Sequence, residues 1–121
     1  MQINLEAAEQ YTIQSYGDAQ ITVNNTDYHA SLIISRQAIV SPWPVHSVQE
    51  LTEEALKPIL AFSPEVIVIG HNQPGLRIPM MLVQYLANQR IGIECMSIGA
   101  ACRTFNVLLG EQRAVVVGFV L

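Results

Sequence analysis

The sequence predicts an α/β fold, and three observations lead to this prediction. Residues 65–121 alternate as strand, helix, strand, helix and strand, which is typical of a sheet with helices packed on it. Residues 10–41 hold short runs of β-branched and aromatic residues between turn residues, which indicates antiparallel hairpins. Half of the 121 residues are hydrophobic and 13% are charged, so residues 1–121 can bury a core as a single domain.

The N-terminal part is expected to form closely spaced strands that end at a break. The predicted strands are 11–15, 20–23 and 29–34. Gly17-Asp18 and Asn24-Asn25 supply turn residues between them. Pro42 and Pro44 then end regular structure, because they fix the backbone and remove two hydrogen-bond donors. Trp43 is expected to pack over the sheet rather than to bind a ligand, since its ring buries a large area.

Two helices and a strand are expected in the middle of the chain. Thr52 caps a helix with two acidic residues in its first turn, and Pro58 keeps that helix short or kinked. Residues 65–70 form a buried strand, and Pro79 suits the first turn of the next helix. Apolar residues at the helical spacing 0, 3, 4, 7 and 8 are expected to face the core, and they are Ile78, Met81, Leu82, Tyr85 and Leu86.

The C-terminal part completes the alternation of strands and helices. Its predicted elements are strand 92–96, helix 99–110 and strand 113–121. The helix is expected to bury Ala101, Phe105 and Leu108. Strands 65–70 and 92–96 should run parallel because a helical crossover joins them, and together with the N-terminal hairpins they make the sheet arrangement mixed.

Polar residues gather in two loops at the carboxyl ends of strands predicted to be neighbours, where ligands of open α/β sheets usually bind. The loops are 70–72 and 97–99, and the second opens a helix whose free N–H groups and dipole favour an anion. The candidate ligand-binding residues are Ser97, Gly99, Arg103, Thr104, Asn106, His71 and Asn72.

Two interpretations of this polar cluster carry equal weight. In the first, Arg103 clamps a carboxylate or phosphate. In the second, Ser97 caps the helix, Arg103 pairs with an acidic neighbour and Asn106 bonds a loop backbone. Structural polar networks and binding sites share the same residue types, so the sequence leaves both open.

Cys102 is a candidate reactive thiol, because a thiol in the first turns of a helix can have a lowered pKa. Nucleophilic catalysis would need a base, and His71 is the histidine on a neighbouring loop. Cysteine is also among the most commonly buried residue types, and the inert buried thiol is the favoured interpretation.

Motifs for other chemistries are incomplete. The segment Cys95-Met96-Ser97-Ile98-Gly99 lacks the first glycine of a nucleophile elbow. The loop from Gly70 to Gly75 precedes Leu76 and Arg77, where a phosphate-binding P-loop needs Lys and Ser or Thr. The histidines His29, His46 and His71 have no metal-ligand spacing. We therefore expect no metal and no cofactor.

Charge and hydropathy narrow the classes of partner. The net charge is −4 and the six Lys and Arg are scattered, so we expect no nucleic-acid partner. No apolar run reaches the roughly 18–20 residues that span a bilayer, so we expect no membrane span. Residues 1–6 lack the features of a signal peptide or presequence, so a cytoplasmic location is expected, where Cys95 and Cys102 are thiols.

The sequence resembles a family of small domains of unknown biochemical activity that includes the mitochondrial complex I assembly factor 3. The match is strongest over residues 97–113 and extends to Trp43, residues 51–54 and the strand ending at Gly70. Within 97–113 the matching residues are Gly99, Ala101, Cys102, Arg103, Thr104, Asn106, Leu108, Leu109, Glu111 and Arg113. Three departures from the family pattern are Ser97 for Thr, Phe105 for Tyr, and Gly70-His71-Asn72 for a Gly-Thr-Gly-like turn.

The resemblance implies a three-layer α/β fold with a central mixed sheet, helices packed on it and an additional N-terminal β-hairpin layer. It implies no established catalytic activity. Because mitochondrial members of the family help to assemble the respiratory NADH dehydrogenase, it also implies a protein partner related to a respiratory complex.

Two hypotheses about function follow from the sequence. The first is a non-enzymatic interaction or assembly-type protein, which is favoured because no catalytic set is complete. The second is a small-molecule (anion) binding domain, or an enzyme, that uses the cleft at the start of helix 99–110. In that case Arg103 would hold the anion and Cys102 or Ser97 would be the nucleophile.

Overall fold

The computed structural model describes residues 12–73, 75 and 77–121, and these form two β-sheets and four helical segments. The smaller sheet has the order β1 (Ile13–Gly17), β2 (Gln20–Val23) and β3 (Thr26–Tyr28). The central sheet has the order β5 (Ile39–Val40), β4 (Leu32–Ile34), β8 (Val115–Val120), β6 (Val66–His71) and β7 (Gly92–Ser97). The helices are the 3₁₀ turn η1 (Val48–Glu50), α2 (Glu53–Leu60), α3 (Met80–Ala87) and α4 (Ile98–Gly110).

The central sheet is mixed, as the sequence predicts. β6 runs parallel to β7 and to β8, while β4 runs antiparallel to β8 and β5. The parallel pairing of β6 and β7 extends from Val66 opposite Gly92 to His71 opposite Ser97. Both strands therefore end at the same edge of the sheet, and the crossover prediction is confirmed.

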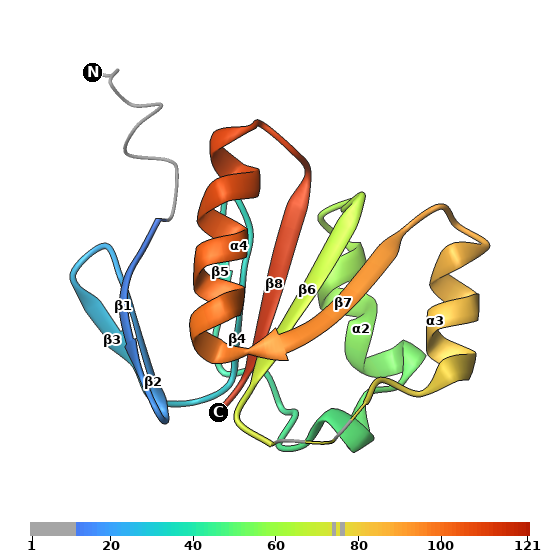
Figure 1. The fold of residues 1–121 in the computed structure, drawn as a ribbon, viewed down its shortest axis with the longest axis horizontal. Coiled ribbons are helices and arrows are strands. Elements are labelled where there is room, and N and C mark those ends of the chain that lie inside the picture. Colours follow the sequence, from blue (N-terminus) through green and yellow to red (C-terminus); the bar gives the residue numbers. More distant parts are fainter. Residues whose placement is uncertain (1–11, 74, 76) are drawn as a thin grey trace.

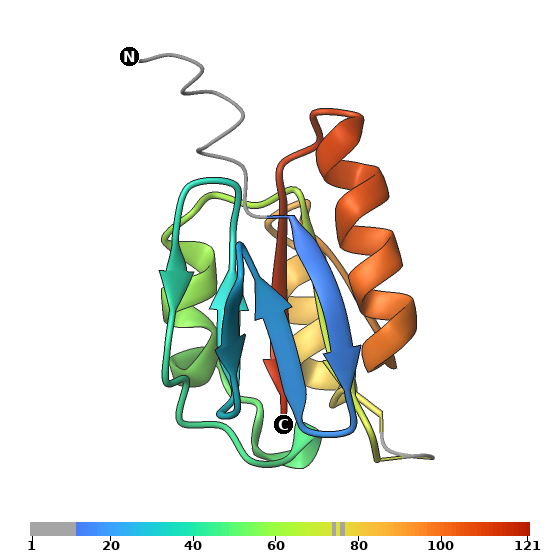
Figure 2. The same cartoon turned by 90° about the vertical axis from the view of Figure 1, so that its left-hand side faces the viewer.

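The molecule has the predicted layers. In Figure 1, α2 and α3 cover one face of the central sheet, while α4 lies on the other face beside the small sheet β1–β3. Figure 2 shows the small sheet from its outer side, with α4 next to it. Phe105, Phe119 and Ile21 belong to the core under α4, and Trp43, Ile59 and Leu86 belong to the core under α2 and α3. The three-layer α/β prediction is confirmed.

Two close contacts set how these layers pack. A Cβ on Gly70 of β6 would lie 2.7 Å from the Cβ of Ala101 and 2.9 Å from a ring carbon of Phe119, so α4 approaches the sheet over a bare backbone. A Cβ on Gly118 of β8 would lie 2.7 Å from the ring of Trp43. Trp43 is buried and its indole N–H donates to the Ala55 carbonyl at 3.0 Å, so the prediction that it packs over the sheet is confirmed.

The capping residue and the proline of helix α2 act as predicted. The Thr52 hydroxyl accepts a hydrogen bond from the Ala55 N–H at 3.1 Å, which caps α2. Pro58 lies inside α2, and this helix is short at eight residues.

Several details differ from the sequence predictions. The first predicted strand begins at Tyr11, which lies outside the described residues, and β1 begins at Ile13. The predicted strand 29–34 shortens to β4, and β3 was missed.

Met81 was predicted to face the core but is 83% exposed. The reason is that α3 packs at the edge strand β7, which covers a narrower stripe of the helix formed by Leu82 and Leu86. In α4, Leu109 is buried and Leu108 is only partly so.

The structure also shows whether any described helix could cross a membrane. Over 12–73, 75 and 77–121, no helix combines the length and the apolar character that crossing a bilayer demands.

Candidate functional site

A cleft lies at the shared carboxyl edge of β6 and β7, as expected for an α/β sheet. We call it the carboxyl-edge cleft. It has a volume of about 740 Å³, and its lining residues are Asp18, His71, Asn72, Gln73, Gly75, Cys95, Met96 and Ser97. The cleft is thus built by the loop after β6, the end of β7 and the turn between β1 and β2. It contains His71, Asn72 and Ser97 of the candidate residues named from the sequence.

His71 is the last residue of β6 and is only 8% exposed. Its Nδ1 accepts a hydrogen bond from the backbone N–H of Gln73 at 2.9 Å. Burial lowers the pKa of His71, because the charged imidazolium loses solvation. The ring is therefore neutral at pH 7, and because Nδ1 accepts, Nε2 carries the proton.

Asn72 connects the two sheets at the cleft. Its side-chain amide N–H donates to the backbone carbonyl of Asp18 in the β1–β2 turn. The bond joins residues 54 positions apart and places Asp18 in the cleft wall. Sequence reasoning assigned Asp18 to a turn and missed this role, because nothing in the local pattern shows which loop the turn will meet.

The start of α4 is capped from within and covered from outside. The Ser97 hydroxyl accepts from the Ala100 N–H at 3.2 Å, which is the capping role of the second sequence interpretation. A Cβ on Gly99 would lie 2.6 Å from the Tyr16 hydroxyl oxygen. Tyr16 of β1 therefore packs directly on the first turn of α4.

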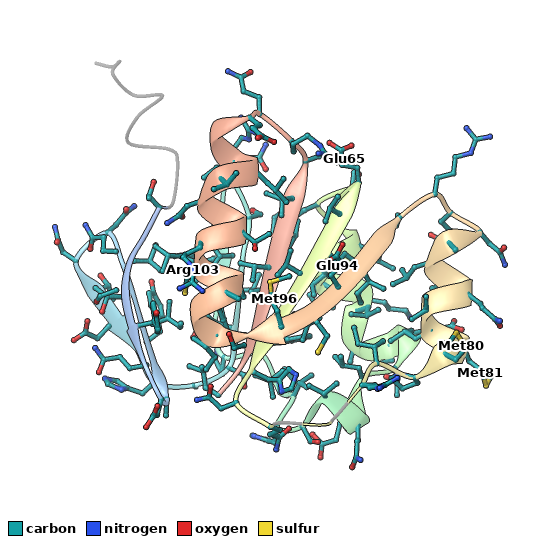
Figure 3. All side chains as sticks on the ribbon, viewed as in Figure 1. Glu65, Met80, Met81, Glu94, Met96 and Arg103 are labelled. Carbon is teal, nitrogen blue, oxygen red and sulfur yellow. The ribbon has the colours of Figure 1, made fainter. Side chains whose placement is uncertain are left out.

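The remaining polar residues of α4 turn toward β1 or the sheet. Arg103 donates to the Tyr16 hydroxyl at 3.4 Å, and Figure 3 shows Arg103 on the side of α4 next to β1. Asn106 holds β1 by two bonds to Ile13: its Oδ1 accepts from the Ile13 N–H at 3.2 Å, and its Nδ2 donates to the Ile13 carbonyl at 3.1 Å. The Thr104 hydroxyl of α4 lies 3.4 Å from the Met96 sulfur of β7, and this is a weak contact between the helix and the central sheet.

Cys102 lies on the buried face of α4. Burial raises the pKa of its thiol to about 11, and this outweighs the opposing effect of the nearby Arg103 guanidinium. Burial also raises the pKa of Cys95, which is half-buried in the cleft wall. A protonated, buried thiol is a poor nucleophile, so the chemistry of Cys102 in this environment is that of a small apolar residue.

The structure thus divides five of the seven predicted residues between two places, while Gly99 and Asn106 line neither of them. His71, Asn72 and Ser97 line the carboxyl-edge cleft. Arg103 and Thr104 line a different, shallow depression of about 220 Å³ that also contains Val107 and Leu108. Within the part of the chain that the structure describes, no three His, Cys, Asp or Glu side chains come together as a metal site would require.

The comparisons with known proteins agree with this fold. The chain is 28% identical over 103 residues to the "13 kDa major membrane protein" of Francisella tularensis, covering 84% of each. It is 27% identical over 110 residues to the human NADH dehydrogenase [ubiquinone] 1 alpha subcomplex assembly factor 3, covering 89% of this chain and 59% of the human protein. The solution structure of a Xanthomonas campestris protein superposes with a TM-score of 0.83 at 28% identity, covering 92% of this chain and 84% of that one.

A protein-family model described as "Protein of unknown function (DUF498/DUF598)" matches residues 13–120, which is most of the chain. The relatives of this chain include an assembly factor, as the sequence resemblance implied. This chain belongs to the DUF498/DUF598 family.

Proposed function

We propose that this chain is a non-enzymatic interaction or assembly-type protein that contacts a protein partner through the outer surface of α4 and β1. We call this surface the α4 surface and define it by Tyr16, Arg103 and Val107. One observation carries the proposal. The polar groups at the start of α4 bond to the chain itself, while these three side chains remain at the surface.

The α4 surface has the composition of a contact site. Tyr16 is 49% exposed and Val107 is 58% exposed, both unusual for large apolar side chains of this protein. Arg103 lies between them, one helical turn before Val107. Tyrosine and arginine are enriched among the residues that dominate interface energies. A fitting partner therefore presents a carboxylate next to an apolar side chain, since a guanidinium pairs with carboxylates in a fork geometry.

The relatives support the same class of function. The human relative is named an assembly factor for NADH dehydrogenase, and this chain spans about three fifths of that protein. This similarity supports, as part of the proposal, a partner connected with a respiratory complex. The residues near the α4 start also argue against a nucleophilic enzyme, because the Cys102 thiol is buried with its pKa raised to about 11 and Ser97 serves as the helix cap.

The test is a pulldown from a native extract, with bound proteins identified by mass spectrometry. Wild type and Arg103→Ala are compared with Arg90→Ala, which removes the same charge from an exposed position at the α3–β7 turn. We expect a defined partner with wild type and Arg90→Ala, and its loss with Arg103→Ala. Circular dichroism and thermal unfolding check that the variants fold equally well.

The proposal fails if a folded Arg103→Ala variant keeps every partner that wild type binds. It also fails if Arg90→Ala loses the same partner, because then overall charge and not the α4 surface decides binding. A variant that unfolds is replaced by Arg103→Gln, which keeps a polar end group and part of the aliphatic stem while removing the charge.

Anion binding at the start of α4 is the second candidate function, and Tyr16 decides whether it operates. The Tyr16 ring lies against Gly99, so an anion can reach the free N–H groups of this turn only if Tyr16 moves. On this candidate, inorganic phosphate raises the unfolding temperature of Tyr16→Ala more than that of wild type. Equal responses of the two proteins would exclude a Tyr16-gated anion site.

A further inference from the structure

The carboxyl-edge cleft shares no lining residue with the α4 surface. Its volume of about 740 Å³ falls in the range of roughly 300–1,000 Å³ that is usual for small-molecule sites. It also lies outside the carboxyl ends of two parallel strands, which is the common ligand position in this class of fold. Neither Arg103 nor any other residue of the α4 surface is among its lining residues.

The charge of the cleft is negative. Of the described residues that line it, Asp18 is the one with a formal charge at pH 7. His71 contributes no positive charge, because burial lowers its pKa. The whole chain carries a net charge of −4, which adds to the same sign of potential. The side-chain charges of the described lining residues therefore favour a cationic ligand over an anionic one.

The hydrogen-bonding groups of the cleft include several acceptors. The amide N–H of Asn72 is held by the Asp18 carbonyl, and this fixes the side-chain orientation with Oδ1 as a second, separate polar atom. Gln73 Oε1 is a buried acceptor, and within the described residues it has no hydrogen-bond partner. The Asp18 carboxylate is an acceptor as well. A buried acceptor without a donor costs free energy. A ligand whose N–H groups reach the acceptor atoms of the cleft therefore gains binding free energy.

We propose that the carboxyl-edge cleft binds a small organic cation that carries N–H donors, of the amine or amidine class. Asp18 supplies the balancing charge, and the amide oxygens of Asn72 and Gln73 accept hydrogen bonds. The Cys95 and Met96 side chains form the apolar part of the wall beside the cation. The proposal does not depend on the partner surface, because no residue is shared between the two.

The test uses three probes that share one ring and differ in charge: benzamidine, benzamide and benzoate. Each is titrated into ¹⁵N-labelled protein, and the backbone amide resonances of residues 71–73 and 95–97 are followed by NMR. We expect saturable shifts with the lowest Kd for benzamidine, a higher Kd for benzamide and the highest for benzoate. Asp18→Asn should raise the benzamidine Kd about three- to fivefold, as expected for an exposed ion pair, and leave the benzamide Kd nearly unchanged.

Asp27→Asn is the matched control, because Asp27 is an exposed aspartate of the same small sheet that lies outside the cleft lining. It should leave all three Kd values unchanged, and so should Arg103→Ala. The proposal is overturned if benzoate binds tightest, or if Asp18→Asn and Asp27→Asn have the same effect. It is also overturned if no probe shifts the cleft resonances at concentrations up to about 10 mM, where even millimolar affinity would be visible.

Discussion

Cys102 illustrates how position, and not residue type, decides the chemistry of a side chain. From the sequence, Cys102 is a candidate reactive thiol because the start of a helix can lower a thiol pKa, while the inert buried thiol is the favoured interpretation. In the fold, Cys102 points into the core under α4, and the loss of solvation raises its pKa to about 11. The nearby Arg103 guanidinium acts on this pKa in the opposite direction but is the smaller effect.

Alkylation with iodoacetamide measures this difference directly. In a Cys95→Ser variant, Cys102 is the one remaining thiol of the chain. With a pKa of about 11, only about one thiol in a thousand is ionised at pH 8, against about a quarter for an ordinary cysteine. We expect alkylation of the native protein to be at least about a hundredfold slower than in urea, and to accelerate as the pH rises toward 10. Equal rates in the native and unfolded protein at pH 8 would show that Cys102 is an accessible, activated thiol.

Local contacts of the site could be predicted from the sequence, whereas contacts between distant parts of the chain could not. The cap formed by Ser97 depends on the next three residues, and one of the two sequence interpretations contains it. The contact of Tyr16 with Gly99 joins residues far apart in the chain. It depends on how the small sheet packs, which no local pattern specifies, so Tyr16 and Asp18 were both missed.

Among the elements, β1 and α4 are joined by the side chain of Asn106, in addition to the contacts of Tyr16 with Gly99 and Arg103. Asn106 both donates to and accepts from the backbone of Ile13, as a neighbouring strand would. This pair of bonds satisfies polar groups of a residue whose side chain is buried. Asn106 therefore stabilises the contact between the small sheet and the rest of the fold.

Replacing Asn106 tests this tether. Asn106→Ala leaves the N–H and carbonyl of Ile13 without their partner, which should lower the free energy of unfolding by about 1–3 kcal/mol. Hydrogen exchange at the Ile13 amide should accelerate more than exchange in the central sheet. Val107→Ala, at an exposed position of the same helix, serves as the control and should change neither quantity appreciably. Unchanged exchange at Ile13 in Asn106→Ala would mean that other contacts hold β1.

Element prediction from the sequence succeeded where the pattern is local and long. The strands at β6, β7 and β8 and the helix α4 follow from apolar runs and helical spacing, and their predicted limits lie within two residues of the observed ones. The prediction that Met81 faces the core failed for a different reason. Helical spacing identifies a stripe of residues, but the width of the stripe that is covered depends on α3 lying at the edge of the sheet.

At the scale of the whole molecule, the layers are held at a spacing that depends on small residues. Gly70 and Ala101 let α4 lie close to β6, and Phe119 fills the space beside them. The carboxyl-edge cleft and the α4 surface both depend on this spacing, because each is built from α4 or its preceding strand together with the small sheet.

Adding one methyl group tests the layer spacing. Gly70→Ala places a carbon 2.7 Å from Ala101 and 2.9 Å from Phe119 in a packed core, so we expect a loss of about 1–3 kcal/mol in urea unfolding. Gly92→Ala on the neighbouring strand is the control, because its added carbon meets no atom within 4 Å. Gly92→Ala should change stability by no more than about 0.5 kcal/mol. Equal stability of the two variants would contradict the packing described for α4.

We propose above that this fold presents the α4 surface to a protein partner. Site-specific photocrosslinking tests it most directly, with p-benzoylphenylalanine replacing Val107 and, as a control, replacing the exposed Gln89 at the α3–β7 turn. We expect one discrete crosslinked product from position 107, which is absent from position 89 and is lost when Arg103→Ala is added. A partner that crosslinks from position 89 and not from 107, or a product at 107 that survives Arg103→Ala unchanged, would contradict it.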